Sequence, residues 1–215
     1  MKRIVVVVAV VAAFAGAVTG GLLSSRKPAQ IDGHIAPSTT VEQAPYQTLK
    51  QYPEPRILAD FALVDQTGQT FNLARWQQRW DLVFFGFTHC PDVCPTTLAT
   101  MSQITQAADL GDALGVTFIS VDPQRDTPAH LADYVNFFDA EFSAATGPEP
   151  QLVALTHQLG VLFDVQPHEA GDSSYNVDHS AAVLLINPEG RLEGQFPAPH
   201  DAEAITADLK RIIQR

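Results

Sequence analysis

Two cysteines, four positions apart, are the most reactive side chains in the sequence. Cys90 and Cys94 are the only cysteines among 215 residues, and they belong to the segment GFTHCPDVCPTTL at 86–98. A pair at this spacing can form a structural disulfide, act as a redox dithiol, or offer two soft ligands to Cu(I) or Zn(II). A disulfide that closes so short a loop constrains the unfolded chain little, because its stabilising effect grows with loop length. The spacing therefore favours a redox pair or a metal site.

The cysteines fall between an expected strand and an expected helix. The apolar run DLVFFGFT at 81–88 is typical of a buried strand, and Pro95 has a fixed φ that suits the first turn of a helix. In open α/β sheets the carboxyl ends of the strands face the functional crevice. The partial positive charge at a helix N-terminus also favours thiolate over thiol. We therefore expect reactive thiolates at this junction.

Two thiolates leave a coordination position that a histidine from elsewhere in the chain can fill. Of the seven histidines, His179 stands directly before the apolar run AAVLLI at 181–186, which we expect to pair beside the strand that leads to the cysteines. A polar loop histidine is the alternative interpretation, and spacing alone leaves both open. His89 is a weaker candidate, because a residue next to Cys90 in an extended segment points the other way.

Several charged residues near these segments have structural as well as functional interpretations. Asp92, between the cysteines, is expected to accept hydrogen bonds from amides at the helix start. Asp178 either orients His179 or faces solvent. Three more charged residues either orient the site, bind a partner, or form a cap and an internal ion pair. These residues are Asp122, Arg125 and Asp126.

Strands alternate with helices through the rest of the chain. A hairpin is expected at 61–73, and strands at 116–121, 142–145, 181–186 and 191–196. Helices are expected from Pro95, from Pro128 after a Thr127 cap, at 150–159 and at 201–213. This order predicts an α/β fold, with a central mixed sheet flanked by helices and an added N-terminal hairpin.

The N-terminus predicts a membrane segment. Residues 4–23 contain no charge, and a helix of this length spans roughly 30 Å, the thickness of a bilayer core. Ala15-Gly16-Ala17 leaves a cleaved signal peptide as the alternative, although the apolar stretch continues past that site. We predict a transmembrane anchor at 1–23, a proline-rich tether at 24–56 and one domain at 57–215.

The net charge argues against some partners. It is −11, and the first 27 residues hold four of the 13 basic side chains and no acidic one, so the remainder is more acidic still. Such a domain is a poor partner for nucleic acid or for an anionic membrane surface. A metal cation or a basic protein face suits it better.

Three segments together resemble the Sco/SenC family. They are GFTHCPDVCPTTL, SVDPQRDTP at 120–128 and VDHSAAVLLINPEG at 177–190, and they occur in that family's order. The resemblance covers about 60–215 and implies a thioredoxin-like fold. It also implies a copper-binding assembly factor for cytochrome c oxidase, with Cu(I), Cu(II) or both held by Cys90, Cys94 and His179.

The resemblance implies partners and a location as well. Such a protein delivers copper to the CuA centre of oxidase subunit II, reduces the cysteines of that subunit, or does both. Another copper chaperone would be its donor. Its anchor would cross the inner membrane once and leave the domain in the periplasm. The metallochaperone is the first interpretation, because a thioredoxin-type oxidoreductase has two residues between its cysteines and this chain has three. A thiol:disulfide oxidoreductase is the second.

Overall fold

The computed structural model describes residues 46–169 and 171–214. The predicted anchor and most of the predicted tether, up to residue 45, lie outside this range. No helix among the described residues is long and apolar enough to cross a membrane.

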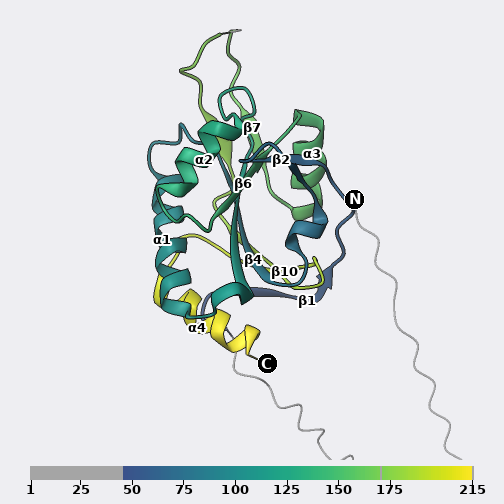
Figure 1. The fold of residues 1–215 in the computed structure, drawn as a ribbon, viewed down its shortest axis with the longest axis vertical. Helices are drawn as coiled ribbons and strands as arrows, with labels where there is room; N and C mark the ends of the chain where they lie inside the picture. The colour runs from purple at the N-terminus through teal and green to yellow at the C-terminus, as the bar shows by residue number, and fades with distance from the viewer. Residues whose placement is uncertain (1–45, 170, 215) are drawn as a thin grey trace, which may run out of the picture. The chain divides into compact units, whose positions relative to one another are not determined.

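A mixed sheet forms the centre of the domain (Figure 1). Within the described residues it has eight strands in the order β1-β10-β9-β4-β5-β6-β2-β3. The strands are β1 (Lys50–Arg56), β2 (Leu63–Asp65), β3 (Thr70–Phe71), β4 (Trp80–Gly86), β5 (Leu114–Ser120), β6 (Ser143–Thr146), β9 (Val183–Ile186) and β10 (Leu192–Phe196). β4, β5 and β6 run parallel, whereas β9 pairs with β4 antiparallel. The strand that leads to the cysteines therefore lies beside the one that follows His179, as predicted.

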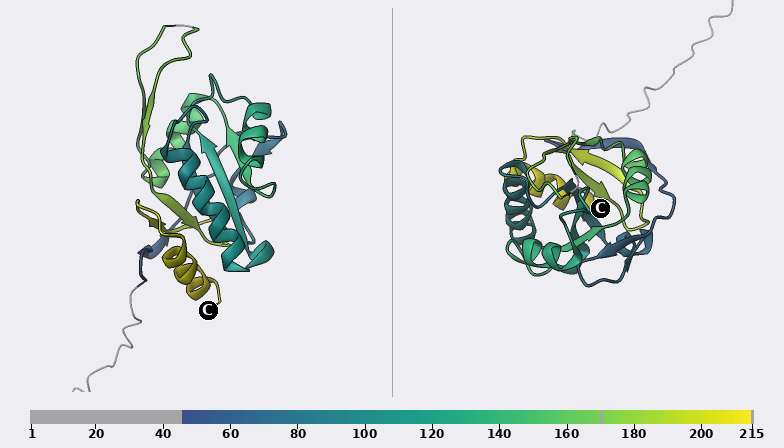
Figure 2. Two further views of the ribbon diagram at one scale, coloured as in Figure 1. Left: turned by 90° about the vertical axis from the view of Figure 1, so that its left-hand side faces the viewer. Right: turned by 90° about the horizontal axis from the view of Figure 1, so that it is seen from above.

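Helices cover both sides of the sheet. They are α1 (Val93–Ala108), α2 (Pro128–Asn136), α3 (Glu149–Leu159) and α4 (Ala202–Ile213), with short 3-10 turns at Leu73–Trp76 and Gly111–Ala113. α1 and α4 pack against each other on one side, and α3 lies on the other (Figures 1 and 2). The Thr127 hydroxyl accepts a hydrogen bond from the amide of His130, which confirms the predicted cap of α2.

The central strands contain continuous apolar runs because both of their faces are buried. Every residue of β5 is buried, and so is every residue of β4 after Trp80. Parallel strands covered by helices on both sides show this composition instead of an alternating one. The structure confirms the predicted hairpin at 61–73, the predicted strand at 81–88 and the strands and helices predicted after it. Their ends differ from the predicted ones by a few residues.

The start of the domain differs from the prediction. Residues 50–56, which we placed in the tether, form the edge strand β1 and pair with β10 through an irregular register. Pro53 and Pro55 obscured this strand in the sequence, because proline is tolerated only at sheet edges and bulges. The carboxylate of Asp208 in α4 holds the preceding segment by accepting the amides of Gln47, Thr48 and Leu49 at 2.7–2.9 Å.

The sequence did not predict a second, two-stranded sheet. We call the segment that contains it, residues 163–169 and 171–179, the excursion. β7 (Phe163–Val165) and β8 (Val177–His179) pair antiparallel, with Phe163 opposite His179. The described residues between these strands extend away from the main sheet (Figures 1 and 2). His179 is therefore the last residue of a strand and lies at the base of this excursion.

Candidate metal centre

Cys90, Cys94 and His179 come together at the carboxyl end of β4. Their two sulfur atoms and one imidazole nitrogen all lie within 4.8 Å of one another. Both cysteines are free thiols. The three side chains that the sequence singled out thus form one cluster, which joins the first turn of α1 and the preceding loop to the end of β8.

The two cysteines occupy different environments. Cys94 is fully buried in the first turn of α1, whereas Cys90 is partly exposed in the loop before the helix. The amide of Cys94 donates a hydrogen bond to the sulfur of Cys90 at 3.4 Å. Gly86 ends β4 directly against Cys94, and a β-carbon at this position would lie only 2.6 Å from Sγ of Cys94. A glycine is therefore required where the strand passes beneath the sulfur.

His179 presents one ring nitrogen to the cysteines. Its Nδ1 lies 3.1 Å from the carbonyl oxygen of Ser180, which can only accept, so Nδ1 holds the hydrogen in this contact. Nε2 is left with its lone pair and lies 3.3 Å from Sγ of Cys94. The rings of Phe84 and Phe87 meet the imidazole edge to face. The backbone contact and the two aromatic rings fix the tautomer and orientation that a metal ligand needs.

Burial shifts the pKa values of Cys94 and His179. It raises the pKa of the Cys94 thiol well above its ordinary value, an effect that the amide of Phe87 opposes by hydrogen bonding. The expectation that the helix N-terminus would make both sulfurs thiolates is therefore wrong for Cys94, because desolvation outweighs the helix dipole. Burial lowers the pKa of His179, so its imidazole is neutral at neutral pH. A bound cation would supply the charge that removes the thiol proton.

Asp126 fixes the loop before the cysteines. Its buried carboxylate accepts hydrogen bonds from the amide of Thr88 at 2.9 Å and from the hydroxyl of Thr88 at 2.6 Å. It also accepts the hydroxyl of Ser120, at the end of β5, at 2.6 Å. The structure thus shows Asp126 as an anchor that ties the loop to the neighbouring strand, a role that the sequence did not specify.

Arg125 holds the excursion that ends in His179. Its guanidinium donates to the carbonyl oxygens of Ser173 and Tyr175 at 3.0 and 2.8 Å, and it stacks 3.6 Å from the centre of the Tyr175 ring. Asp122 completes the unit, because its carboxylate accepts both from Arg125 and from the Tyr175 hydroxyl. The internal ion pair expected for Asp122 and Arg125 is therefore present. Sequence reasoning missed Tyr175, since nothing in its local pattern connects it to residues some 50 positions earlier.

The remaining candidates have other surroundings. Asp92 is exposed and caps no helix amide with its side chain, so the predicted amide contacts are wrong; its carboxylate accepts only the Thr96 hydroxyl at 3.4 Å among the described groups. Asp178, which we expected either to orient His179 or to face solvent, is exposed to solvent. His89 does not join the cysteine cluster and lies instead beside Asp126.

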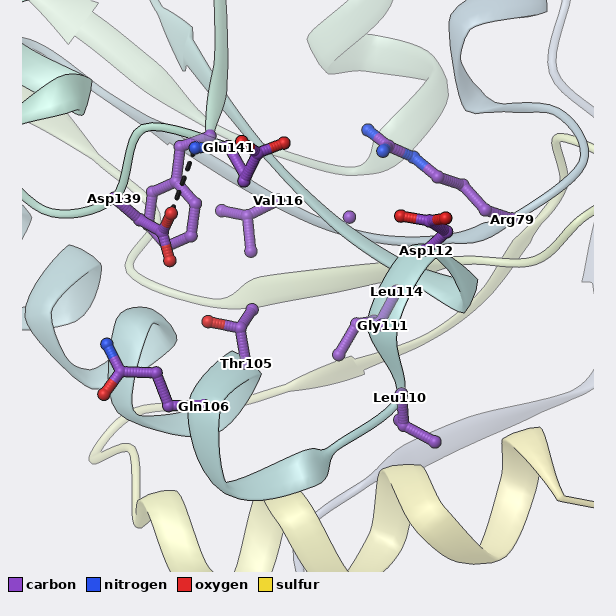
Figure 3. Close-up of a pocket in the computed structure, with 12 residues that line it drawn as sticks. Arg79, Thr105, Gln106, Leu110, Gly111, Asp112, Leu114, Val116, Asp139 and Glu141 are labelled. Carbon is purple, nitrogen blue, oxygen red and sulfur yellow. Dashed lines mark hydrogen bonds between the residues drawn. The ribbon is translucent and has the colours of Figure 1, made fainter.

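A cleft at the other end of β5 has no connection with this cluster. It has a volume of about 320 Å³ and lies near the start of β5 and the last turns of α1 (Figure 3). Arg79, Asp112 and Glu141 are among its lining residues, and the amide of Glu141 donates to Asp139. No cysteine or histidine lines it. It offers none of the soft ligands that distinguish the cysteine cluster.

The cluster has the chemistry of a site for a soft metal ion. Two sulfurs and one imidazole nitrogen suit Cu(I), and a tetrahedral ion such as Zn(II) would need one more ligand. The partial exposure of Cys90 leaves one side of the cluster open to an incoming group. The arrangement can therefore bind a metal ion and exchange it with a partner's ligands.

Comparison with known proteins connects this chain to one family. The SCO1/SenC family model matches residues 50–214. A protein of Stutzerimonas stutzeri described as copper-binding is 37% identical over 163 residues, which make up 75% of this chain and 79% of that protein. The mitochondrial SCO2 homologue of Bos taurus is 35% identical over 155 residues, or 71% of this chain, and the match spans only 58% of the bovine protein.

A solved structure agrees with these matches. The copper-bound structure of ScoI from Bradyrhizobium japonicum has a TM-score of 0.65 and 35% identity, and the match covers 72% of this chain and 98% of that one. This likeness confirms the predicted thioredoxin-like fold, with its mixed sheet and flanking helices.

Proposed function

Because the chain belongs to the SCO1/SenC family, we propose that it binds copper and acts in the assembly of cytochrome c oxidase. In finer detail, it is a metallochaperone that delivers copper to the CuA site of oxidase subunit II. The copper is cargo, held by the thiolates of Cys90 and Cys94 and by Nε2 of His179. The convergence of these three ligand atoms within 4.8 Å is the observation that supports the proposal most strongly.

The surroundings of the cluster support binding followed by release. His179 is neutral and oriented before a metal arrives, so little has to reorganise when copper binds. A three-coordinate Cu(I) leaves a position at which a partner's ligand can attack, and the partial exposure of Cys90 favours entry from that side. Copper can then move by stepwise ligand exchange to subunit II, and it would arrive from a donor chaperone in the same way.

The location belongs to the same proposal. Residues 1–23 would anchor the chain once in the inner membrane and the domain would work in the periplasm. Cell fractionation with protease protection tests this placement. A protein that is released with the periplasmic fraction would contradict the anchor and favour cleavage after Ala17.

The experiment that tests the ligand set is a Cu(I) competition titration of the full chain in detergent. Replacement of His179 by alanine removes the only nitrogen ligand and should weaken Cu(I) binding by about tenfold or more. His157→Ala is the matched control, because His157 is an exposed histidine on α3, outside the cluster. Equal affinities for the His179→Ala variant and the unmodified protein would remove His179 from the proposed ligand set.

Thiol:disulfide exchange is a second candidate function, favoured by the two free thiols and their unequal exposure. The Cys90 thiolate would attack a disulfide of subunit II and form a mixed disulfide, with one partner sulfur leaving as a thiol. The Cys94 sulfur would then displace the second partner thiol and form the Cys90–Cys94 disulfide. The partner gains two electrons and two protons, and this chain loses them.

Single-cysteine variants separate the two steps of this exchange. Cys94→Ser should trap the mixed disulfide through Cys90, and Cys90→Ser should trap little, since Cys94 is buried. Mass spectrometry after mixing with an oxidised subunit II fragment measures both adducts. No adduct with the Cys94→Ser variant would contradict the exchange function while leaving copper binding untouched.

A further inference from the structure

A second group of metal-ligating side chains lies outside the cysteine cluster. We define the histidine–aspartate cluster as His89, Asp126 and His130, whose ligand atoms all lie within 4.8 Å of one another. His89 belongs to the loop after β4, Asp126 to the loop after β5, and His130 to the first turn of α2. Residues from three separate segments thus direct an oxygen and two ring nitrogens to one place.

The Thr88 hydroxyl shows how closely these groups converge. Its oxygen lies 2.6 Å from Oδ1 of Asp126, 3.2 Å from Nδ1 of His89 and 2.9 Å from Nε2 of His130. The two imidazole rings are 5.9 Å apart and inclined by 38°. Both histidines therefore present a nitrogen to the same point, beside the same carboxylate oxygen.

Asp126 is a fixed ligand and the histidines are adjustable ones. The carboxylate of Asp126 is fully buried, and its other oxygen is held by the Thr88 amide and the Ser120 hydroxyl. Ligating carboxylates are commonly oriented by such outer hydrogen bonds. His89 and His130 are exposed, so their rings can turn toward an ion. The ligand atoms would have to close to roughly 2.8–3.0 Å apart, the spacing of neighbouring ligands around a square-planar ion with bonds of about 2.0–2.1 Å.

From this convergence we propose that His89, Asp126 and His130 form a second, solvent-facing site for a divalent transition-metal ion, with Cu(II) bound most tightly. Two imidazoles and one carboxylate are harder ligands than the thiolates of Cys90 and Cys94, and they suit Cu(II), Ni(II) and Zn(II). Cu(II) stands highest among these ions at sites of this type. Water and the Thr88 hydroxyl can complete the coordination. The proposal is independent of copper delivery by the cysteine cluster.

The site can be tested without interference from the thiols. The full chain with Cys90→Ser and Cys94→Ser cannot reduce Cu(II) through its cysteines, and it serves as the parent for a titration followed by EPR. We expect the parent to bind one equivalent of Cu(II) with hyperfine structure from two nitrogens. Adding His130→Ala should weaken binding by about tenfold or more and remove one nitrogen coupling.

Controls keep the test decisive. His130 is exposed and its backbone amide still reaches the Thr127 hydroxyl after substitution, so the variant should keep its fold. His157→Ala in the same parent should leave Cu(II) binding unchanged. Cu(II) affinity and EPR spectra that do not change with His130→Ala and His89→Ala, or a parent that binds no Cu(II), would overturn the second site. Failure of the proposed function would appear separately, as weak Cu(I) binding by the chain with its cysteines intact.

Discussion

Gly86 gives the sharpest test of how the strand positions the buried cysteine. A β-carbon at this residue would stand 2.6 Å from Sγ of Cys94 and 3.0 Å from Cε2 of Phe118. Ordinary contacts between such atoms are about 3.5–4.0 Å, so Gly86→Ala has to displace the sulfur by about 1 Å. Metal–ligand distances tolerate only about 0.2 Å. The sulfur would leave its position 3.3 Å from His179, at a cost shared between stability and copper binding.

The expected magnitude follows from this overlap. Overpacking a buried site typically costs about 1–3 kcal/mol, which lowers Tm by roughly 2–12 °C in a domain of this size. If the Cys94 sulfur moves away from the other ligands, the Kd for Cu(I) should rise by about tenfold or more, since each 1.4 kcal/mol changes it by about tenfold. Thermal unfolding and a Cu(I) competition titration of the full chain measure the two effects.

Gly115→Ala is the matched control for Gly86→Ala. Gly115 lies in the neighbouring strand β5 at its opposite end, and the atoms nearest to its added β-carbon would be those of the Arg79 guanidinium, a flexible side chain that can move away. This variant should bind Cu(I) normally. Adding Cys94→Ser to Gly86→Ala should recover part of the lost stability, because oxygen is smaller than sulfur. A Gly86→Ala protein with unchanged Tm and unchanged Cu(I) affinity would refute the reasoning.

Three further predictions concern other parts of the domain. Burial raises the pKa of Asp81 to about 6, so ionisation of this carboxyl destabilises the fold. The contribution of Asp81 to the free energy of unfolding is fully present below its unfolded-state pKa and is lost as the pH rises through about 6. The loss amounts to about 3 kcal/mol. Asp81→Asn should remove this loss, and urea unfolding at several pH values would refute it if both proteins show the same pH dependence. Arg125→Ala removes two hydrogen bonds to the excursion, and a bond to a charged group contributes about 1.5–3 kcal/mol. Hydrogen exchange at 171–179 should therefore accelerate by about tenfold or more, and Arg125→Lys should restore the slow exchange only in part. Unchanged exchange in the Arg125→Ala variant would contradict the anchoring role. Asp208→Ala leaves three backbone amides without their acceptor and should lower the free energy of unfolding by about 2–4 kcal/mol. Asp208→Asn should lower it by less. A change below about 0.5 kcal/mol for Asp208→Ala would show that this anchor contributes nothing.

The central sheet and the cysteine cluster could be predicted because their signals are local. The apolar runs at 81–88 and 181–186 are typical of buried strands, and their pairing placed His179 near the cysteines. The choice of His179 as the proposed third ligand came from the resemblance to a family, since spacing alone favoured a polar loop histidine. The helix start was also local, because Pro95 falls within the first turn of α1.

The parts that were missed depend on contacts between distant residues. β1 contains two prolines and no regular alternation, and it is a strand only because β10 offers it an edge. The Arg125–Tyr175 stack joins two loops that no sequence period connects. The raised pKa of Cys94 results from complete burial, which a helix-start argument does not include. Tertiary packing decided each of these features.

The most direct test of the copper site is X-ray absorption on the full chain loaded with one equivalent of Cu(I). We predict a three-coordinate spectrum with two sulfur neighbours and one imidazole nitrogen, and the loss of the nitrogen contribution in the His179→Ala variant. A first shell of two sulfurs alone, identical in both proteins, or one without sulfur, would contradict the assignment of Cys90, Cys94 and His179 as the ligands.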